Sequence, residues 1–203
     1  MNYIDSLNHR HGYLHLIAGP MFSGKTTELF RMLSVANEAG FMRILHVNSA
    51  IDTRSFASHN KGINIPENIT TRQVQDLSEI LPHIDNFDVI GIDEAQFFTD
   101  LKDIVINLVE EHNKYVIVAG LDADINRNKF GQILDLIPYC DEIRKIYPFC
   151  ILCSKNGIIK RGLFSKLVTS KETCEYNDNG NVIKVGGKDK YIPVCRNCFN
   201  MAG

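Results

Sequence analysis

Apolar residues recur along the first 150 positions in short runs that alternate with longer amphipathic segments. Runs of four to seven mostly apolar residues predict buried strands, whereas apolar positions spaced by three and four predict helices. The predicted strands cover residues 13–18, 43–48, 87–93, 115–120 and 143–149. The predicted helices cover residues 27–38, 76–81, 100–109 and 130–137, and residues 49–66 are predicted to form a long loop.

Strands that alternate with helices predict an α/β fold with an open, mostly parallel sheet, which binds ligands at the carboxyl ends of its strands. The composition changes near Cys150, so we expect an α/β domain over residues 1–149 and a cysteine-bearing appendage over residues 150–203. Because no apolar run is long enough to span a membrane and residues 1–10 are too polar for a secretory signal, we expect a cytoplasmic protein with no membrane partner.

Charge is distributed unevenly along the 203 residues. The segment from Cys150 onward has nine Lys and Arg against four Asp and Glu, whereas the rest of the chain has thirteen against twenty. A basic segment could bind nucleic acid, but a segment that meets nucleotide phosphates would have the same charge. The chain has neither tryptophan nor an arginine stripe, so the sequence favours the second interpretation and no nucleic-acid partner.

The segment Gly19–Thr26 matches the pattern G-x-x-x-x-G-K-[ST] of a phosphate-binding loop and lies between a predicted strand and a predicted helix. Backbone N–H groups and a helix N-terminus together bind a triphosphate in such a loop. Lys25 is assigned to the β- and γ-phosphates, and the Thr26 hydroxyl to Mg²⁺. The predicted contacts of this loop with the nucleotide are Gly19, Met21, Phe22, Ser23, Gly24, Lys25, Thr26 and Thr27.

Two adjacent carboxylates, Asp93 and Glu94, follow the predicted strand 87–92. A carboxylate at the end of such a strand holds Mg²⁺ beside Thr26, and a second carboxylate in the cleft suits a general base. The alternative is that the pair only begins a loop, which the phosphate loop disfavours. Arg54 is a further candidate for a phosphate clamp, with a solvated surface arginine as the alternative.

Four of the six cysteines form two C-x-x-C pairs, Cys150 with Cys153 and Cys195 with Cys198, which are separated by 41 residues. Two such pairs can bring four thiolates to one structural Zn²⁺. Disulfides are the main alternative, and a redox motif would account for one pair only. The polar segment 169–190 between the pairs is expected to form a loop that closes over the substrate.

Taken in order, these motifs resemble the type II thymidine kinases through nearly the whole chain. The resemblance is carried by residues 19–29, by Asp52-Thr53-Arg54, by residues 92–98, by Gly120-Leu121-Asp122, and by residues 186–191 and 194–198. It implies that the protein transfers the γ-phosphoryl group of ATP to the 5′-hydroxyl of thymidine or deoxyuridine, with Mg²⁺ and a structural Zn²⁺. It also implies a homotetramer that is inhibited by dTTP.

The resemblance assigns Glu94 as the base that takes the proton of the 5′-hydroxyl, and adds Asp52, Arg54, Asp93 and Gln96 to the nucleotide site. The residues that it assigns to the thymidine site are Met21, Phe97, Leu121, Phe130, Val182, Ile183, Lys184, Val185, Gly186 and Tyr191. Met21 and Leu121 would lie near the 5-methyl group of thymine.

This chain departs from the family pattern at two positions. Ile125 stands where the family usually has a second aromatic residue near the base, and Leu167 stands where it commonly has an arginine. Arg161 and Lys166 are both candidates for the phosphate contact that Leu167 cannot make. Two rival hypotheses are a phosphate-loop ATPase that acts on nucleic acid through a zinc ribbon, and a regulator that binds nucleotides without catalysis.

Overall fold

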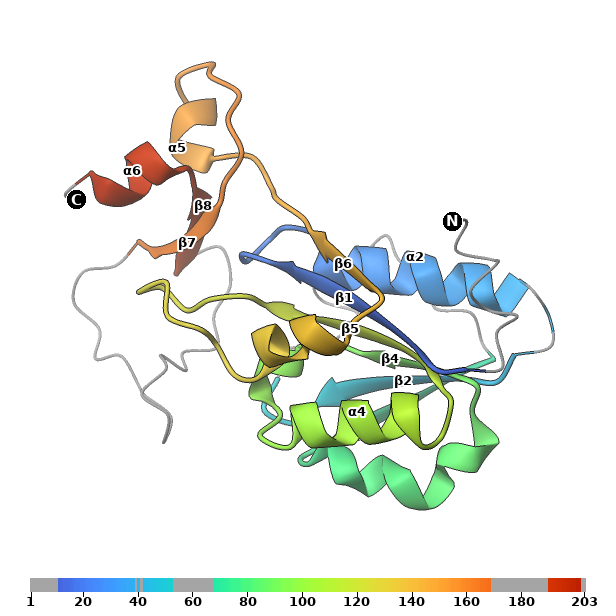
Figure 1. Ribbon diagram of the computed structural model, residues 1–203. Coiled ribbons are helices and arrows are strands. Elements are labelled where there is room, and N and C mark those ends of the chain that lie inside the picture. Colours follow the sequence, from blue (N-terminus) through green and yellow to red (C-terminus); the bar gives the residue numbers. More distant parts are fainter. Residues whose placement is uncertain (1–10, 39, 41, 53–67, 169–189, 202–203) are drawn as a thin grey trace.

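The computed structural model of the protein describes residues 11–38, 40, 42–52, 68–168 and 190–201. Its larger part is a six-stranded sheet in the order β3-β2-β4-β5-β1-β6, and every strand pair in it is parallel (Figure 1). The strands are β1 (Tyr13–Gly19), β2 (Ile44–Ser49), β3 (Ile69–Val74), β4 (Val89–Ile92), β5 (Tyr115–Leu121) and β6 (Glu142–Lys145). The predicted α/β fold is therefore confirmed.

Helices cover both faces of this sheet, which explains why its central strands are apolar without alternation. Helix α2 (Lys25–Glu38) covers one face, and α4 (Leu101–Glu110) lies on the other together with the 3₁₀ helices η1 (Leu77–Asn86) and η3 (Ile133–Tyr139) (Figure 1). In β1, Leu14 and Leu16 pack toward α4, whereas Ile17 packs against the α2 side. The phosphate loop thus begins on a strand that is buried on both sides.

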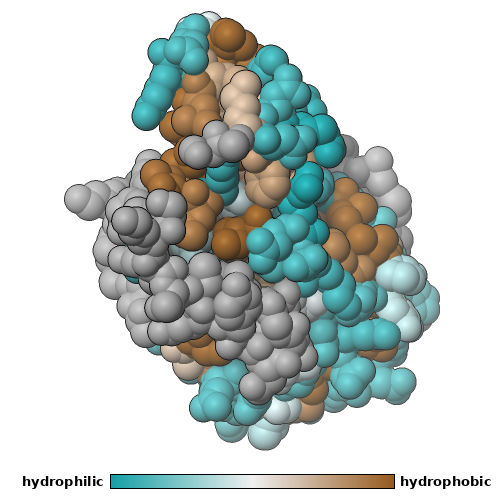
Figure 2. All heavy atoms as spheres, turned by 90° about the vertical axis from the view of Figure 1, so that its left-hand side faces the viewer, coloured by the Kyte–Doolittle hydropathy of each residue, from teal (hydrophilic) through white to brown (hydrophobic). Residues whose placement is uncertain are grey.

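A smaller C-terminal unit follows β6. It consists of the antiparallel pair β7 (Phe164–Leu167) and β8 (Tyr191–Val194) with two short helices, α5 (Ile151–Ser154) and α6 (Arg196–Asn200). Figure 1 shows this unit standing above the carboxyl end of the sheet, and Figure 2 shows apolar side chains gathered on its surface. Large exposed apolar residues here include Phe149, Ile159 and Met201.

The sequence missed β3, which lies at one edge of the sheet. Only its end residues Ile69 and Val74 are buried, and the four residues between them are polar. An edge strand with polar residues at its centre shows neither a continuous apolar run nor alternation, which are the patterns that reveal strands.

Three other predicted elements differ from the structure. Residues 130–137 were predicted as a helix ending before Pro138, but the structure has the 3₁₀ helix η3 with Pro138 inside it, and a hydrogen bond from Cys140 N–H to Ile137 O closes its last turn. The predicted strand 143–149 corresponds only to β6, which ends at Lys145, and Pro148 has no N–H that could extend a strand ladder to residue 149. The short helix predicted at 76–81 is the longer 3₁₀ helix η1.

Candidate functional site

The predicted phosphate loop and the acidic pair meet at the carboxyl ends of three neighbouring strands, β1, β4 and β5. Gly19 ends β1 beside Leu121, its partner in β5, and Ile92 of β4 pairs with Val118 of β5. Residues 93 and 94 follow directly after β4. Ligands bind at this edge in open parallel sheets, because loops leave the strands there in different directions.

The phosphate loop leads directly into helix α2, which begins at Lys25. Gly24 has a φ of +86°, a left-handed conformation that favours glycine at this position. The Lys25 ammonium is buried and donates to the carbonyl oxygen of Pro20 at 2.9 Å. The lysine side chain therefore folds across the loop, where phosphate oxygens of a bound nucleotide would meet it.

Asp93 is buried beside this loop at the end of β4. Burial and the neighbouring charge of Glu94 raise the pKa of Asp93 to about 7, although a hydrogen bond from the Thr26 hydroxyl acts in the opposite direction. A buried carboxylate and a hydroxyl that face each other are oxygen ligands of the type that Mg²⁺ prefers. The two residues therefore fit a magnesium ion.

Glu94 has a left-handed backbone conformation, with φ 48° and ψ 38°. It immediately precedes the 3₁₀ helix η2 (Ala95–Phe97), and its Oε2 accepts a hydrogen bond of 2.6 Å from Nε2 of Gln96. Gln96 is itself buried. The structure thus gives the second carboxylate a fixed hydrogen-bond partner.

The residues assigned to the thymidine site fall into two groups. Phe97 and Phe130 are in edge-to-face contact, with ring centroids 5.8 Å apart, and Leu121 lies across the β-ladder from Gly19. Tyr191 is buried at the start of β8, in the C-terminal unit. Residues 182–186, also assigned to this site, lie outside the described residues.

A hydrogen bond joins the C-terminal unit to the phosphate loop. The Met21 N–H donates to the hydroxyl of Ser165 in β7 at 3.0 Å, and Ser165 is buried. Sequence reasoning did not single out Ser165. A serine 144 residues away from its partner carries no local signal, so only the folded chain reveals the contact.

A cavity of about 220 Å³ lies where the loop, β6 and the C-terminal unit meet. Its walls include Pro20 of the phosphate loop and Ser165 of β7. On the third side, Lys145 of β6 forms an ion pair with Asp122 at 2.6 Å, just beyond the end of β5. The cavity is therefore next to the predicted substrate site, and the phosphate loop forms part of its wall.

Asp52 and Arg54 were predicted to lie near the nucleotide. Asp52 is buried, and its carbonyl accepts a hydrogen bond from the Gln73 side chain, which also donates to the carbonyl of Ser49. The missed strand β3 therefore holds the chain segment that leads to Arg54. Arg54 itself lies outside the described residues.

The four cysteines of the two C-x-x-C pairs converge in the C-terminal unit. Their sulfur atoms all lie within 4.8 Å of one another, and all four side chains are buried. Loss of contact with water raises the pKa of Cys153 to about 12, whereas a backbone hydrogen bond from Cys198 lowers the pKa of Cys195 to about 7. Only a cation would let four such thiols ionise together, so the cluster could bind zinc.

Basic residues of the C-terminal region have structural partners. Lys166 donates to the carbonyl oxygens of Cys198, Phe199 and Met201, which lie at the C-terminal end of α6. Arg161 lies over the ring of Tyr147, at 5.7 Å. Lys166, one of the two candidates for a phosphate contact, is thus bound to the helix that carries Cys198.

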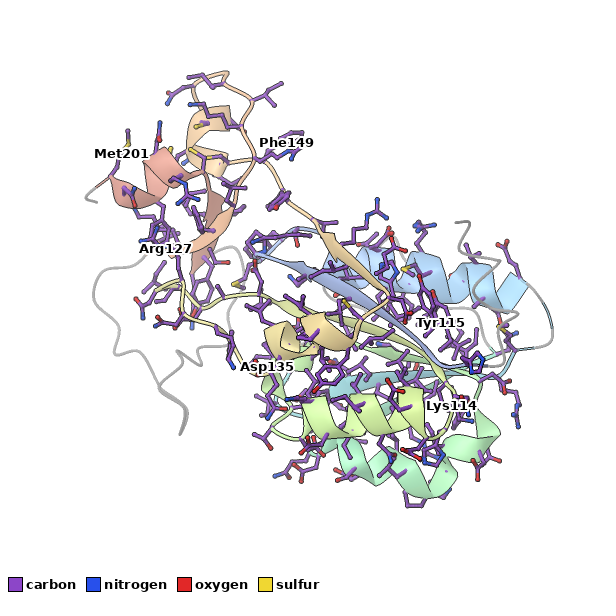
Figure 3. The ribbon with its side chains drawn as sticks, in the orientation of Figure 1. Lys114, Tyr115, Arg127, Asp135, Phe149 and Met201 are labelled. Carbon is purple, nitrogen blue, oxygen red and sulfur yellow. The ribbon has the colours of Figure 1, made fainter. Side chains whose placement is uncertain are left out.

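Arg127 connects the two parts of the molecule. It lies in the loop after β5 and reaches up to the C-terminal unit (Figure 3), where its guanidinium is 4.6 Å from the ring centre of Phe199 and 5.5 Å from that of Phe164. Arg196 lies over the same Phe164 ring at 5.1 Å. Such cation–π contacts contribute about 0.5–2 kcal/mol each.

Comparison with known proteins decides the family. A family model described as thymidine kinase matches residues 12–199, a range that contains both the phosphate loop and the four cysteines. The chain belongs to the thymidine kinase family.

Curated relatives extend this result. A thymidine kinase of Oryza sativa subsp. japonica is 38% identical over 194 residues, which are 91% of this chain and 65% of the rice protein. Thymidine kinases of Amsacta moorei entomopoxvirus and sheeppox virus are 34% and 36% identical over 192 residues each. These matches cover 92% and 93% of this chain and 97% of each viral protein.

The resemblance seen in the sequence is therefore confirmed, and nothing in the comparisons favours a nucleic-acid ATPase. Among the described residues, no helix is long and apolar enough to cross a membrane.

Proposed function

We propose that this chain transfers the γ-phosphoryl group of ATP to the 5′-hydroxyl of thymidine, with deoxyuridine as an alternative acceptor, and that Glu94 is its catalytic base. The observation that carries the proposal is the placement of Glu94 next to a buried Asp93 that is hydrogen-bonded to Thr26 of the phosphate loop. The acceptor hydroxyl must lose its proton beside the γ-phosphate, and a carboxylate held at that position can accept it.

The phosphate loop would bind the triphosphate through its backbone N–H groups and the N-terminus of α2. Its contribution is supported by the position of the Lys25 ammonium above the loop and by the order of the loop, strand and helix. Thr26 and Asp93 would hold Mg²⁺, which supplies positive charge to the phosphate oxygens when it is bound. Gly19, Ser23, Thr27, Asp52 and Arg54 remain predicted contacts of the nucleotide.

The transfer step needs one proton acceptor. The 5′-hydroxyl oxygen forms a bond to the γ-phosphorus while the bond from that phosphorus to the β–γ bridging oxygen breaks, so that ADP leaves. The hydroxyl proton goes to the Glu94 carboxylate. The contact between Glu94 and Gln96 holds this carboxylate in place while the substrate binds.

The thymidine would lie between the phosphate loop and the C-terminal unit. Phe97 and Phe130 offer an aromatic wall, and Leu121 with Met21 offers apolar surface near the 5-methyl group. Tyr191 would approach from β8. The Ser165 hydroxyl supports this arrangement because it fixes the backbone of Met21.

The four cysteines are proposed to bind a structural Zn²⁺, with no open position for chemistry. We also propose that residues 1–149 and 150–203 form two domains, and that the protein is a cytoplasmic homotetramer inhibited by dTTP. The assembly and the inhibition rest on the family resemblance alone. Gel filtration with light scattering and a dTTP titration of the activity would test the assembly and the inhibition.

The decisive experiment compares Glu94→Gln with the exposed control Glu110→Gln. The glutamine at position 94 keeps the shape of the side chain but cannot accept the proton, so we expect the kcat with thymidine and MgATP to fall at least about a hundredfold while both substrates still bind. The control should retain its activity. Near-normal turnover by the Glu94 variant would refute the base assignment, and turnover of deoxycytidine but not thymidine would refute the substrate.

A further inference from the structure

The side chain of Gln96 spans two strands of the site. Its Nε2 donates to Oε2 of Glu94 at 2.6 Å, and its Oε1 accepts from the backbone N–H of Leu121 at 2.9 Å. The amide is buried, so water does not compete for either bond. One primary amide therefore connects the predicted base, after β4, to the last residue of β5.

Both ends of this amide are needed at once. A methionine of similar length has neither the donor nor the acceptor, and a glutamate keeps the acceptor for Leu121 but brings a second negative charge to Glu94. The packing leaves little room for adjustment: a Cβ on Gly120 would lie 2.8 Å from Oε1 of Gln96. The site is thus built around a glutamine in a single orientation.

Glu94 also needs an external constraint. Its left-handed backbone conformation is uncommon for a residue with a side chain and costs on the order of 1–3 kcal/mol unless the surroundings favour it. Gln96 lies two residues further along the chain, and its hydrogen bond fixes the Glu94 carboxylate relative to that backbone. A base that is displaced by about 1 Å can lose about two orders of magnitude in rate.

We infer that Gln96 is a positioning residue that holds the Glu94 carboxylate in the direction of the acceptor hydroxyl by attaching it to the backbone of Leu121. This inference rests on the proposed role of Glu94. It replaces the contact with the nucleotide that the sequence suggested for Gln96, because its amide is engaged on the side of the base. It also links the base to the wall of the thymidine site, since Leu121 belongs to both.

The test is a steady-state comparison of Gln96→Met and Gln96→Glu with the full-length wild type. We expect Gln96→Met to lower kcat about 10- to 100-fold, which is the loss expected from one hydrogen bond to a charged group, with the KM values for thymidine and ATP within about twofold. Gln96→Glu keeps the bond to Leu121 and should be impaired at least as strongly. A purely structural role would instead leave Gln96→Glu the more active of the two. A nucleotide-binding role would raise the KM for ATP.

Gln132 provides a matched control. Its side chain joins two backbone groups, donating to Thr99 O at 2.6 Å and accepting from Lys102 N–H at 2.8 Å, but Gln132 directly precedes η3 and connects it to the start of α4. Gln132→Met should lower the unfolding temperature without changing kcat. An equal loss of kcat in this control would show that disruption of any glutamine side-chain bridge is sufficient, and would overturn the inference.

A double-mutant cycle separates this inference from the proposed function. If Gln96 acts only through Glu94, Gln96→Met should add less than about a twofold loss in the Glu94→Gln background, measured in single turnovers. A full additional loss there would overturn the positioning role even if Glu94 is the base. If Glu94→Gln alone is fully active, the proposed function fails instead. Should Gln96→Met not fold, Gln96→Glu takes its place in the cycle and in the comparison with Gln132→Met.

Discussion

The two parts of the molecule are stabilised in different ways. The α/β sheet has extensive apolar clusters on both faces, with fully buried residues such as Phe30, Leu33, Phe98 and Leu101. The small C-terminal unit buries its four cysteines and Val194, with a few partly buried neighbours. A unit of this size cannot bury enough apolar surface to be stable alone, so its order depends on its cysteines and its contacts with the sheet.

The candidate site combines residues from both parts of the molecule. The phosphate loop and the acidic pair are attached to the stable sheet, whereas Ser165 and Tyr191 belong to the unit that depends on the cysteines. We therefore expect nucleotide binding and thymidine binding to respond differently to perturbation. Three predictions test the different stabilisation of the two parts, beginning with the largest effect.

Removal of a cysteine should disrupt the C-terminal unit and leave the sheet folded. Zinc contributes about 10–16 kcal/mol to the folding of small zinc domains, far more than the apolar contacts of this unit can replace. We expect Cys195→Ser, or chelation of the metal, to make residues 150–168 and 190–201 sensitive to proteases. Loss of the hydrogen bond from Met21 to Ser165 should raise the KM for thymidine by about tenfold, while α2 and its sheet keep their circular dichroism.

Cys140→Ser is the control, because Cys140 is half-buried and lies outside the cluster. It should retain its bound zinc, measured by atomic absorption, and an unchanged KM. A Cys195→Ser protein that binds one equivalent of zinc and keeps its affinity for thymidine would show that the two units are not stabilised differently.

Acid should destabilise the sheet through His46. Burial next to Phe30 lowers the pKa of His46 to about 4, below its ordinary value of about 6.5, so the unfolded chain takes up the proton first. Stability is therefore constant above pH 6.5 with respect to this group, and falls as the pH drops from 6.5 toward 4, by about 2 kcal/mol at pH 5. Urea unfolding of wild type and His46→Leu at pH 7.5 and pH 5 would measure the difference.

Burial also lowers the pKa of His15, so the wild type will have some acid sensitivity from that residue as well. The informative quantity is the change in pH dependence between variants. His112→Leu, at a part-exposed histidine in the turn after α4, should keep the pH dependence of the wild type. If His46→Leu keeps it too, burial of His46 is not the origin.

The smallest effect is expected at Lys166. Its ammonium donates to three carbonyl oxygens at the end of α6, so Lys166→Met should weaken that helix by about 1–3 kcal/mol. Hydrogen exchange of the α6 amides should accelerate, together with the release of zinc to a chelator, while kcat changes little. Lys155→Met, on an exposed lysine beyond α5, should change neither rate. A loss of ATP affinity in Lys166→Met would instead favour a phosphate contact.

Features that depend on neighbouring residues could be predicted from the sequence, whereas contacts between distant residues could not. The parallel sheet and the phosphate loop follow from local patterns, because buried parallel strands are continuously apolar and the loop is a contiguous motif. The convergence of the four cysteines follows from their spacing. In contrast, the bonds from Gln96 to Leu121 and from Met21 to Ser165 join residues 25 and 144 positions apart. Each depends on the final packing of two elements, which no local pattern contains.

The position of β1 in the sheet has a consequence for synthesis of the protein. β1 lies between β5 and β6, so Tyr13 pairs with Tyr115, and His15 pairs with both Ile117 and Glu142. A chain emerging from the ribosome cannot give β1 its first neighbour until more than a hundred further residues have been made. The strand that carries the phosphate loop therefore stays unpaired during this time. The loop acquires its folded shape only after most of the α/β sheet has left the ribosome.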